Sequence, residues 1–106
     1  MPKKNTVAKN EIVNDNNAVN ISGVVMRAKQ LEKVCRFTLD VQNTTPKGNV
    51  AHSYIPCVWF NGESEDTVTD GERIGVNGSL RSGSYENKEG KKVYTLDLVV
   101  ENVIFS

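Results

Sequence analysis

The aromatic side chains of this sequence are its best candidates for a binding chemistry. The segment YIPCVWF, residues 54–60, has the composition of a β-strand. Successive side chains on a strand point to opposite faces, which places Tyr54 and Phe60 on one face and Trp59 on the other. We expect Trp59 in a core and the other two rings outside it, where flat rings stack on nucleic-acid bases at about 1–3 kcal/mol per base. The alternative is that Tyr54 and Phe60 pack under a loop or at a subunit interface.

A third ring, Tyr85, lies in the hydrophilic segment RSGSYENKEGKK, where no core is available to bury it. Basic residues surround it. This combination suits a single-stranded nucleic acid, because its bases stack on rings and its phosphates attract cations. We expect phosphate contacts from Arg81, Lys88, Lys91 and Lys92, and weaker candidates are Lys29, Lys33 and Arg36. The alternative is a solvated hairpin whose tyrosine has no binding role.

Few residues suit catalysis or metal binding. General acid–base catalysis usually needs a histidine or a carboxylate pair, and His52 is the only histidine. We expect it at the surface or at a strand edge. Cys35 and Cys57 are too few and too far apart for a CxxC zinc knuckle or a disulfide framework, and the acidic residues of segment 62–72 lack calcium-loop spacing. The sequence therefore predicts a protein that is not an enzyme and uses no metal or cofactor.

Composition favours a single β-rich domain. The chain has 106 residues, which is enough for one domain. It contains 15 Val, 5 Ile and 7 Thr against 5 Leu, and β-branched side chains favour strands. Thirteen basic and thirteen acidic residues balance, so recognition of a charged partner depends on local clustering. No apolar run approaches the roughly 20 residues of a spanning helix and no secretory signal is visible, so we expect a cytoplasmic protein.

The elements that must position these residues are five predicted strands, each with alternating apolar and polar residues. They cover residues 19–27, 35–41, 54–60, 74–80 and 94–105. The last strand is expected to contain a bulge near 101–102. Proline and glycine mark a loop over 43–50, and poor helix formers make the connection 61–72 a loop as well. Residues 89–90 are expected at the tip of a polar hairpin.

Five short strands with one apolar face each favour a closed barrel, because closure removes exposed sheet edges. Gly23 and Gly78 lie inside strands, where a strongly coiled strand has no room for a side chain. The sequence predicts an all-β, five-stranded OB-fold barrel with a long hairpin between the fourth and fifth strands, and an SH3-like barrel is the alternative. Residues 1–18, rich in Asn, are expected to form a flexible N-terminal arm, and residues 19–106 the OB-fold domain that binds the single strand.

The stretch from Tyr54 to Phe105 resembles bacterial single-stranded DNA-binding proteins of the SSB family. The resemblance is carried by YIPCVWF and DGERIGVNGSLRSGSYENKEGKKVYTLDLVVENVIF, with weaker echoes in VNISGVVMRA and CRFTLDVQN. Its most specific piece is SYENKEGKKVYT with the glycine-containing strand before it, since the family has an aromatic, a polar tip with glycine, and then Tyr or Phe after a basic residue. The resemblance implies that Tyr54, Phe60 and Tyr85 bind the nucleic acid and that Trp59 belongs to the core.

This sequence departs from the family pattern in two places. The connection over 61–70 is shorter than the family's helix at this point. The sequence stops at Ser106 without the Gly-rich linker and acidic tip with which SSB proteins recruit other enzymes, so recruitment through such a tail is expected only if the sequence is part of a longer chain. Both features resemble the PriB-like primosomal relatives, which bind single strands as dimers.

Two functional hypotheses follow from the residues and the resemblance. The leading one is sequence-tolerant binding of single-stranded DNA in replication, recombination or repair. The alternative is a PriB-like or adaptor module whose main partner is a replication protein. The resemblance implies self-association as a dimer or a tetramer in either case, and a two-fold dimer is the smallest closed assembly.

Overall fold

Five strands form the described part of the chain, which in this computed structural model is residues 14–62 and 66–105. They are β1 (Val19–Gln30), β2 (Cys35–Thr44), β3 (Val50–Trp59), β4 (Arg73–Glu86) and β5 (Lys92–Phe105). All five predicted strands are present, and each is longer than the alternation of its side chains indicated. These ranges contain no helix, and so none that is long and apolar enough to cross a membrane.

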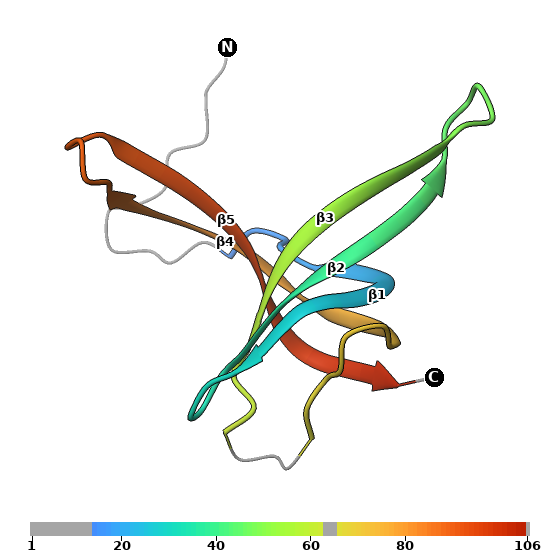
Figure 1. Ribbon diagram of the computed structural model, residues 1–106, viewed down its shortest axis with the longest axis horizontal. Coiled ribbons are helices and arrows are strands. Elements are labelled where there is room, and N and C mark those ends of the chain that lie inside the picture. Colours follow the sequence, from blue (N-terminus) through green and yellow to red (C-terminus); the bar gives the residue numbers. More distant parts are fainter. Residues whose placement is uncertain (1–13, 63–65, 106) are drawn as a thin grey trace.

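The strands close into a barrel in the order β1-β2-β3-β5-β4 (Figure 1). β1 closes the barrel by pairing with both β4 and β2. Its first half pairs with β4 and its second half with β2. Val24 marks the change, since it lies opposite both Arg73 and Asp40. The remaining join is a parallel pairing of residues 57–59 in β3 with residues 98–100 in β5. This closed five-stranded topology confirms the predicted OB-fold barrel.

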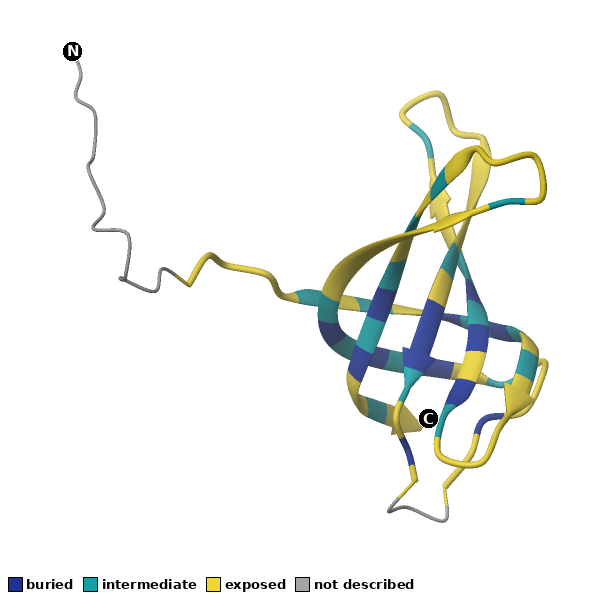
Figure 2. Cartoon of the chain, turned by 90° about the vertical axis from the view of Figure 1, so that its left-hand side faces the viewer, coloured by how far each residue is buried: buried dark blue, intermediate teal, exposed yellow. Residues whose placement is uncertain are grey.

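The core of the barrel takes buried residues from every strand. Figure 2 colours the buried residues dark blue along the chain. On β2, Cys35, Phe37 and Leu39 are buried while Arg36 between them is exposed, which is the predicted alternation. The largest fully buried side chains are Leu39, Ile74, Leu98, Val25, Val76, Cys35 and Cys57. Burial of each large aliphatic side chain contributes about 1.5–3 kcal/mol, so this layer accounts for much of the stability.

Two glycines let neighbouring strands approach closely. A Cβ atom on Gly23 would lie 2.5 Å from the carbonyl oxygen of Asp40, and one on Gly78 would lie 1.9 Å from that of Val99. The close backbone explains both glycines, as the sequence predicted. Beside Gly78 the pairing of β4 with β5 shifts by one residue, which leaves Glu101 as the extra residue of the predicted bulge.

Two hairpins, β2–β3 and β4–β5, continue beyond the barrel and diverge from each other (Figure 1). The sequence pattern places Tyr94 and Leu96 on the apolar face of the last strand, together with Leu98. Leu98 is fully buried, but Tyr94 and Leu96 are 74% and 55% exposed. The alternation is as expected, but these two side chains do not share the core with Leu98, because the hairpin leaves the barrel before it reaches them.

Burial on β3 differs from the prediction at two positions. Trp59 was expected in the core, but it is only partly buried and packs against the core from its end. Val58 was expected on the outward face and does lie there, yet it is only 6% exposed. It occupies the middle of that face, between Arg36 on β2 and Val99 on β5, so neighbouring side chains cover it.

The connection between β3 and β4 is tied to the barrel by one buried amide. Asn61 is 5% exposed, and its side chain exchanges hydrogen bonds of 2.9 and 3.1 Å with the side chain of Gln30. It also donates to the carbonyl oxygen of Asp66 at 2.9 Å. Val68, also 5% exposed, joins the core cluster. The described residues of this connection form turns without a helix, as predicted.

The predicted N-terminal arm lies mainly outside the described residues. Residues 14–18 are exposed and precede β1. The side-chain amide of Asn17 donates to the carbonyl oxygen of Leu80 and its side-chain oxygen accepts from the Leu80 N–H, both at 2.8 Å. These two bonds hold Asn17 beside β4. The flexibility predicted for residues 1–18 stays a prediction.

Candidate nucleic-acid interface

Strands β2, β3, β5 and β4 lie side by side in the barrel and share one outer face. Arg36 on β2 lies opposite Val58 on β3, which in turn lies opposite Val99 on β5. Arg81 on β4 lies opposite Asp97 on β5. Residues directly opposite each other on adjacent strands point to the same side of a sheet. The outer face therefore combines two predicted cations, one carboxylate and an apolar centre.

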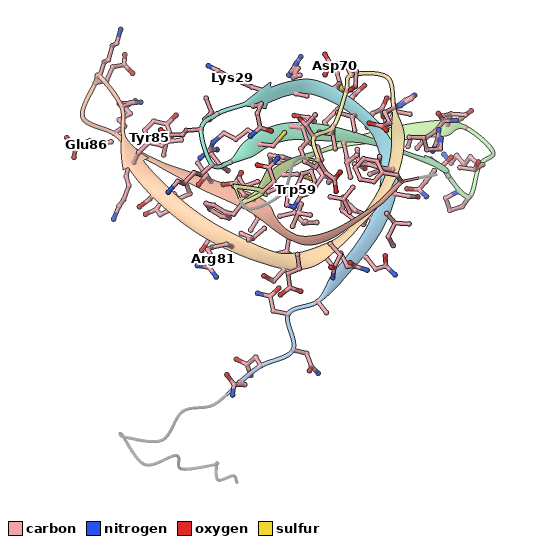
Figure 3. The ribbon with its side chains drawn as sticks, turned by 90° about the horizontal axis from the view of Figure 1, so that it is seen from below. Lys29, Trp59, Asp70, Arg81, Tyr85 and Glu86 are labelled. Atoms are coloured by element: carbon pink, nitrogen blue, oxygen red, sulfur yellow. The ribbon has the colours of Figure 1, made fainter. Side chains whose placement is uncertain are left out.

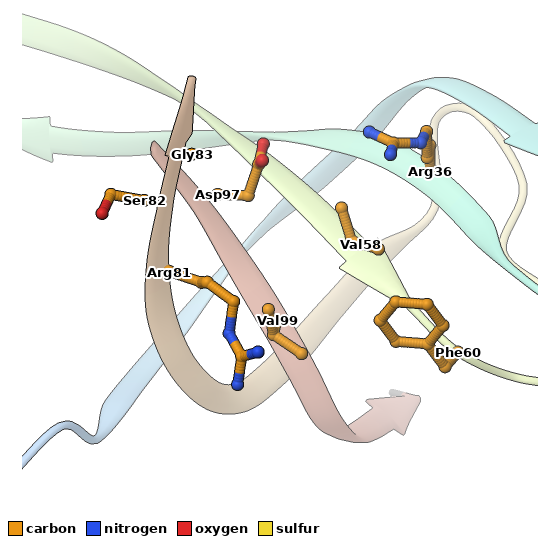
Figure 4. A pocket seen from close by; sticks show the side chains of 8 residues that line it. All are labelled: Arg36, Val58, Phe60, Arg81, Ser82, Gly83, Asp97 and Val99. Carbon is orange, nitrogen blue, oxygen red and sulfur yellow. The ribbon is translucent and has the colours of Figure 1, made fainter. Parts of the chain in front are cut away.

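A hollow of about 510 Å³ opens in this outer face (Figure 4). We call it the β3–β5 hollow, and it is lined by Arg36, Val58, Phe60, Arg81, Ser82, Gly83, Asp97 and Val99. Small-ligand sites typically enclose about 300–1,000 Å³, so the hollow has the size of such a site. Val58 and Val99 form its apolar floor, with Phe60 toward one end and Asp97 toward the other (Figure 4).

Phe60 is the predicted stacking residue at this hollow. It follows the last residue of β3, and its side chain is 69% exposed. In Figure 4 the side chains of Arg36 and Arg81 lie on opposite sides of the apolar floor beside the ring. The exposed ring can stack one base, while the two cations of the same hollow can neutralise phosphates of the bound strand.

Tyr54 forms a second platform on the β2–β3 hairpin, where its ring is 59% exposed. The ring of His52 lies parallel to it, with an interplanar angle of 10° and a centroid distance of 6.2 Å. His52 is in turn hydrogen-bonded to Asp40, with 2.8 Å between Nδ1 and Oδ1. This bond fixes the orientation of the imidazole, which lies stacked against the Tyr54 ring. Sequence analysis placed His52 at the surface, which is correct, but assigned it no binding role.

Tyr85 forms a third platform on the outer face of the β4–β5 hairpin, with its ring 56% exposed. The hairpin tip is held by Asn87, whose side-chain oxygen accepts hydrogen bonds from the backbone N–H groups of Glu89 at 3.0 Å and Lys91 at 2.9 Å. Gly90 has φ = 79°, a conformation that side chains disfavour. The tip is therefore a defined turn, as predicted, and it holds Tyr85 outside the barrel.

The predicted lysines of this hairpin do not all lie on the side of Tyr85. Lys88 and Lys91 are exposed at the tip. Lys92 is on the opposite face of the hairpin, where its Nζ lies 5.9 Å from the centre of the Tyr94 ring. Strand alternation places Tyr85 on the other side, because it pairs with the residue between Lys92 and Tyr94. Lys88 and Lys91 are thus better placed than Lys92 to contact a strand that stacks on Tyr85.

The weaker basic candidates also separate in space. Arg36 lines the β3–β5 hollow, opposite Arg81. Lys29, near the end of β1, and Lys33, in the turn that follows, are exposed elsewhere. In Figure 3, Lys29 and Arg81 lie on opposite sides of the barrel with Trp59 between them. The structure favours Arg36 over both lysines as a partner of Phe60.

The three exposed rings, Tyr54, Phe60 and Tyr85, are separate contact points along a possible path for a single strand across the outer face. Tyr54 and Phe60 are six residues apart along β3 and its end, which corresponds to about 20 Å. Tyr85 lies two residues beyond Gly83, the last residue of β4 that lines the hollow, which corresponds to about 7 Å. One extended strand can cross from one hairpin to the other over the hollow. Such a path suits several nucleotides, and a single OB fold binds about 4–16.

Asp97 is the residue of this face that sequence analysis missed. In the segment TLDLVV it has the outward phase, two residues before Val99, so alternation alone would have placed its charge outside the core. What alternation does not give is the parallel pairing that brings Asp97 to the hollow beside β3. That pairing joins residues about forty positions apart and depends on closure of the barrel.

The two cysteines, Cys35 and Cys57, are free thiols buried in the barrel. Burial, and secondly the negative charge of Asp97, raise the pKa of the Cys57 thiol to about 12, against a smaller opposing effect of a backbone hydrogen bond at Leu39. The thiol is therefore protonated at neutral pH and is a poor nucleophile. Within residues 14–62 and 66–105, no three His, Cys, Asp or Glu side chains are grouped to hold a metal ion.

Comparison with known proteins agrees with this geometry. Residues 17–106 match the model of the Single-strand binding protein family. A single-stranded DNA-binding protein of Clostridium perfringens is 38% identical over 76 residues, which are 68% of this chain and 49% of that protein. Single-stranded DNA-binding protein 1 of Staphylococcus aureus is 34% identical over 77 residues, 68% of this chain and 46% of that protein. The chain thus spans about half the length of these relatives.

Among solved structures, the Plasmodium falciparum SSB complex with ssDNA superimposes with a TM-score of 0.75. The match covers 91% of this chain and 99% of that one, at 16% sequence identity. This likeness shows that the two chains share the barrel and its strand connections.

Proposed function

Because the chain belongs to the single-strand binding protein family, we propose that it binds single-stranded DNA with little dependence on sequence. In this proposal the bases stack on Tyr54, Phe60 and Tyr85. Phosphates contact the guanidinium group of Arg81 and the ammonium groups of the hairpin, from Lys88, Lys91 and Lys92. We add Arg36 to these phosphate contacts because it lines the β3–β5 hollow. Stacking tolerates any base, since every base has a π-face.

The observation that carries the proposal is the exposure of these three rings on the outer face. Their side chains are 59%, 69% and 56% exposed, and they lie outside the core cluster. Strand alternation gives all three rings the outward phase, so a single strand that follows this face can stack a base on each ring in turn. The proposed path also passes over the hollow in which the Phe60 ring lies beside two arginines.

We place this binding in DNA replication, recombination or repair in the cytoplasm, because those processes expose single strands. Replication proteins are proposed as further partners on the same ground.

Self-association is a separate part of the proposal. Leu80, Leu96 and Tyr94 are 40%, 55% and 74% exposed, and alternation places them on the inner face of the β4–β5 hairpin, away from Tyr85. An exposed apolar patch of this kind typically marks a protein interface. We therefore propose that this patch is covered in a dimer or a tetramer. Multi-angle light scattering at micromolar concentration should give a multiple of 11.7 kDa, and a monomer mass alone would contradict the proposal.

Fluorescence anisotropy with a labelled oligo-dT of about 16 nucleotides tests the binding function. Unlabelled single strands of mixed sequence should compete nearly as well as unlabelled oligo-dT. A duplex of the same length should compete poorly, because its bases are stacked inside and cannot reach the rings. Absence of an anisotropy change at micromolar protein, or equal competition by the duplex, would contradict the proposed function.

A further inference from the structure

The β3–β5 hollow contains one group that a purely electrostatic binding site would not have. Asp97 is the only carboxylate among the residues that line it. Its side chain is partly buried, and it makes no hydrogen bond or ion pair with the residues that the structure describes, Arg36 and Arg81 included. The two arginines therefore leave both carboxylate oxygens of Asp97 available to a ligand.

A free carboxylate at this position constrains what a bound strand can place there. An ionised aspartate only accepts hydrogen bonds, so it repels a phosphate and attracts an N–H donor. The floor of the hollow, Val58 and Val99, is apolar and suits the flat face or edge of a base. Phe60 lies toward the other end of that floor and is available for stacking. These contacts together fit a base whose donor edge points to Asp97.

The four bases differ in the donors on their Watson–Crick edges. Guanine has two adjacent donors, N1–H and the N2 amino group, which match the two oxygens of one carboxylate. Cytosine and adenine each offer one amino group. Thymine offers only N3–H between two carbonyl oxygens, which a carboxylate repels. Paired hydrogen bonds to an ionised group are the stronger and more selective kind.

We propose that the β3–β5 hollow is a base-selective seat in which Asp97 accepts hydrogen bonds from guanine, within an interface that otherwise tolerates any sequence. The inference rests on the proposed function, because it assumes that a single strand crosses the outer face. It goes beyond that function by assigning one position of the path a preferred base. Tyr54 and Tyr85 lie outside the hollow. The carboxylate opposite Tyr54, Asp40, is already hydrogen-bonded to His52, so these two rings are expected to be indifferent to the base.

The test compares three oligonucleotides of about 16 nucleotides, the upper end of the sites bound by one OB fold. One is oligo-dT. The second carries isolated guanines between thymines at regular intervals, and the third carries hypoxanthine at the same places, which keeps N1–H but lacks the amino group. Good bidentate pairs to a base discriminate by about 5- to 150-fold. In this open hollow we expect the lower end, with guanine about five- to tenfold tighter than thymine and hypoxanthine between them.

Two variants test whether the guanine preference depends on Asp97. Asp97→Asn should tighten binding of oligo-dT by removing a negative charge, and it should abolish the difference between guanine and hypoxanthine because the paired acceptor is lost. Glu86→Gln removes the same charge at the end of β4, outside the hollow, and should keep the difference. A guanine preference that persists in Asp97→Asn would overturn the proposal.

The unmodified protein gives an answer that does not depend on how the variants fold. Equal affinity for the three oligonucleotides, with tight binding of oligo-dT, would overturn the guanine seat and leave the proposed function intact. Failure to bind oligo-dT at all would overturn the proposed function and the seat with it.

Discussion

Removal of the Phe60 ring tests stacking against packing at the centre of the proposed path. The side chain is 69% exposed, so about a third of it is buried. A fully buried Phe→Ala change costs about 3–5 kcal/mol of stability, and a proportional share here is about 1 kcal/mol. Loss of one stacked base should cost about 1–3 kcal/mol of binding free energy, which is about 5- to 150-fold in Kd. Phe60→Ala should therefore weaken binding strongly and leave the protein folded.

Two further variants separate an aromatic contact from a merely apolar one. Phe60→Tyr keeps the π-face and should bind oligo-dT within about twofold of the unmodified protein. Phe60→Leu keeps apolar bulk without a ring and should lose nearly as much affinity as Phe60→Ala. The assays are anisotropy titration for binding and a thermal melt for stability. If Phe60→Ala and Phe60→Leu bind as tightly as the unmodified protein, Phe60 is not a stacking residue and the path does not cross the hollow.

Charge, packing and titration give three further predictions. The double variant Lys91→Glu, Lys92→Glu should weaken binding. The slope of log affinity against log salt should become flatter by about 0.7 for each phosphate that the variant no longer neutralises. An unchanged slope would show that the hairpin tip is not part of the binding site. Gly78→Ala should destabilise the barrel by about 3 kcal/mol or more, because its Cβ would lie 1.9 Å from a backbone oxygen of β5. Gly75→Ala is the matched control, since its Cβ would meet nothing closer than 3.8 Å, and an equal urea midpoint for both variants would contradict the packing argument. The pKa of Cys57 is raised from 9.0 to about 12, so the stability that its protonated thiol contributes is complete below pH 9 and is lost as the pH rises toward 12. Urea unfolding across that range should show a smaller alkaline loss for Cys57→Ala than for the unmodified protein, and equal losses would contradict the assignment.

Much of the fold could be predicted because alternation of side chains is a local property. The buried residues of β2, the two strand glycines and the bulge at Glu101 all follow from residues within a few positions of each other. Closure of the strands into a barrel could also be predicted, since five strands with one apolar face have few other ways to cover the edges of their sheet. The tip at Gly90 followed from turn chemistry.

Burial along the hairpins could not be predicted in the same way. Tyr94 continues the alternation of Leu98 perfectly, but the barrel ends between them, and the position of that end depends on how far β4 and β5 pair. Val58 has an outward phase and is nevertheless covered, because strands from distant parts of the sequence flank it on both sides. Alternation gives the face of a residue, and only the assembled barrel gives its exposure.

The residues of the candidate site also fall into those that local sequence indicates and those that only the assembled barrel brings together. Tyr54, Phe60 and Tyr85 could be selected from strand phase and from a hydrophilic context, and the structure exposes all three rings. Their role in binding stays a prediction. The position of Asp97 in the lining of the hollow depends on the parallel pairing of β3 with β5, which no short stretch of sequence encodes. Likewise the parallel stack of His52 on Tyr54 depends on the hydrogen bond of the histidine to the neighbouring strand.

Photocrosslinking tests the central claim most directly, because it reports which side chains touch the bases. The protein would be irradiated in complex with an oligo-dT that carries a photoreactive thymine analogue, and the adducts would be located by mass spectrometry. We predict adducts at Tyr54, Phe60 and Tyr85 on the outer face. Tyr94 is 74% exposed in the single chain and lies on the opposite face of the hairpin, where the proposed self-association would cover it, so we expect no adduct there. Adducts concentrated at Tyr94, with none at the three predicted rings, would show that the strand binds the other face and would contradict this account.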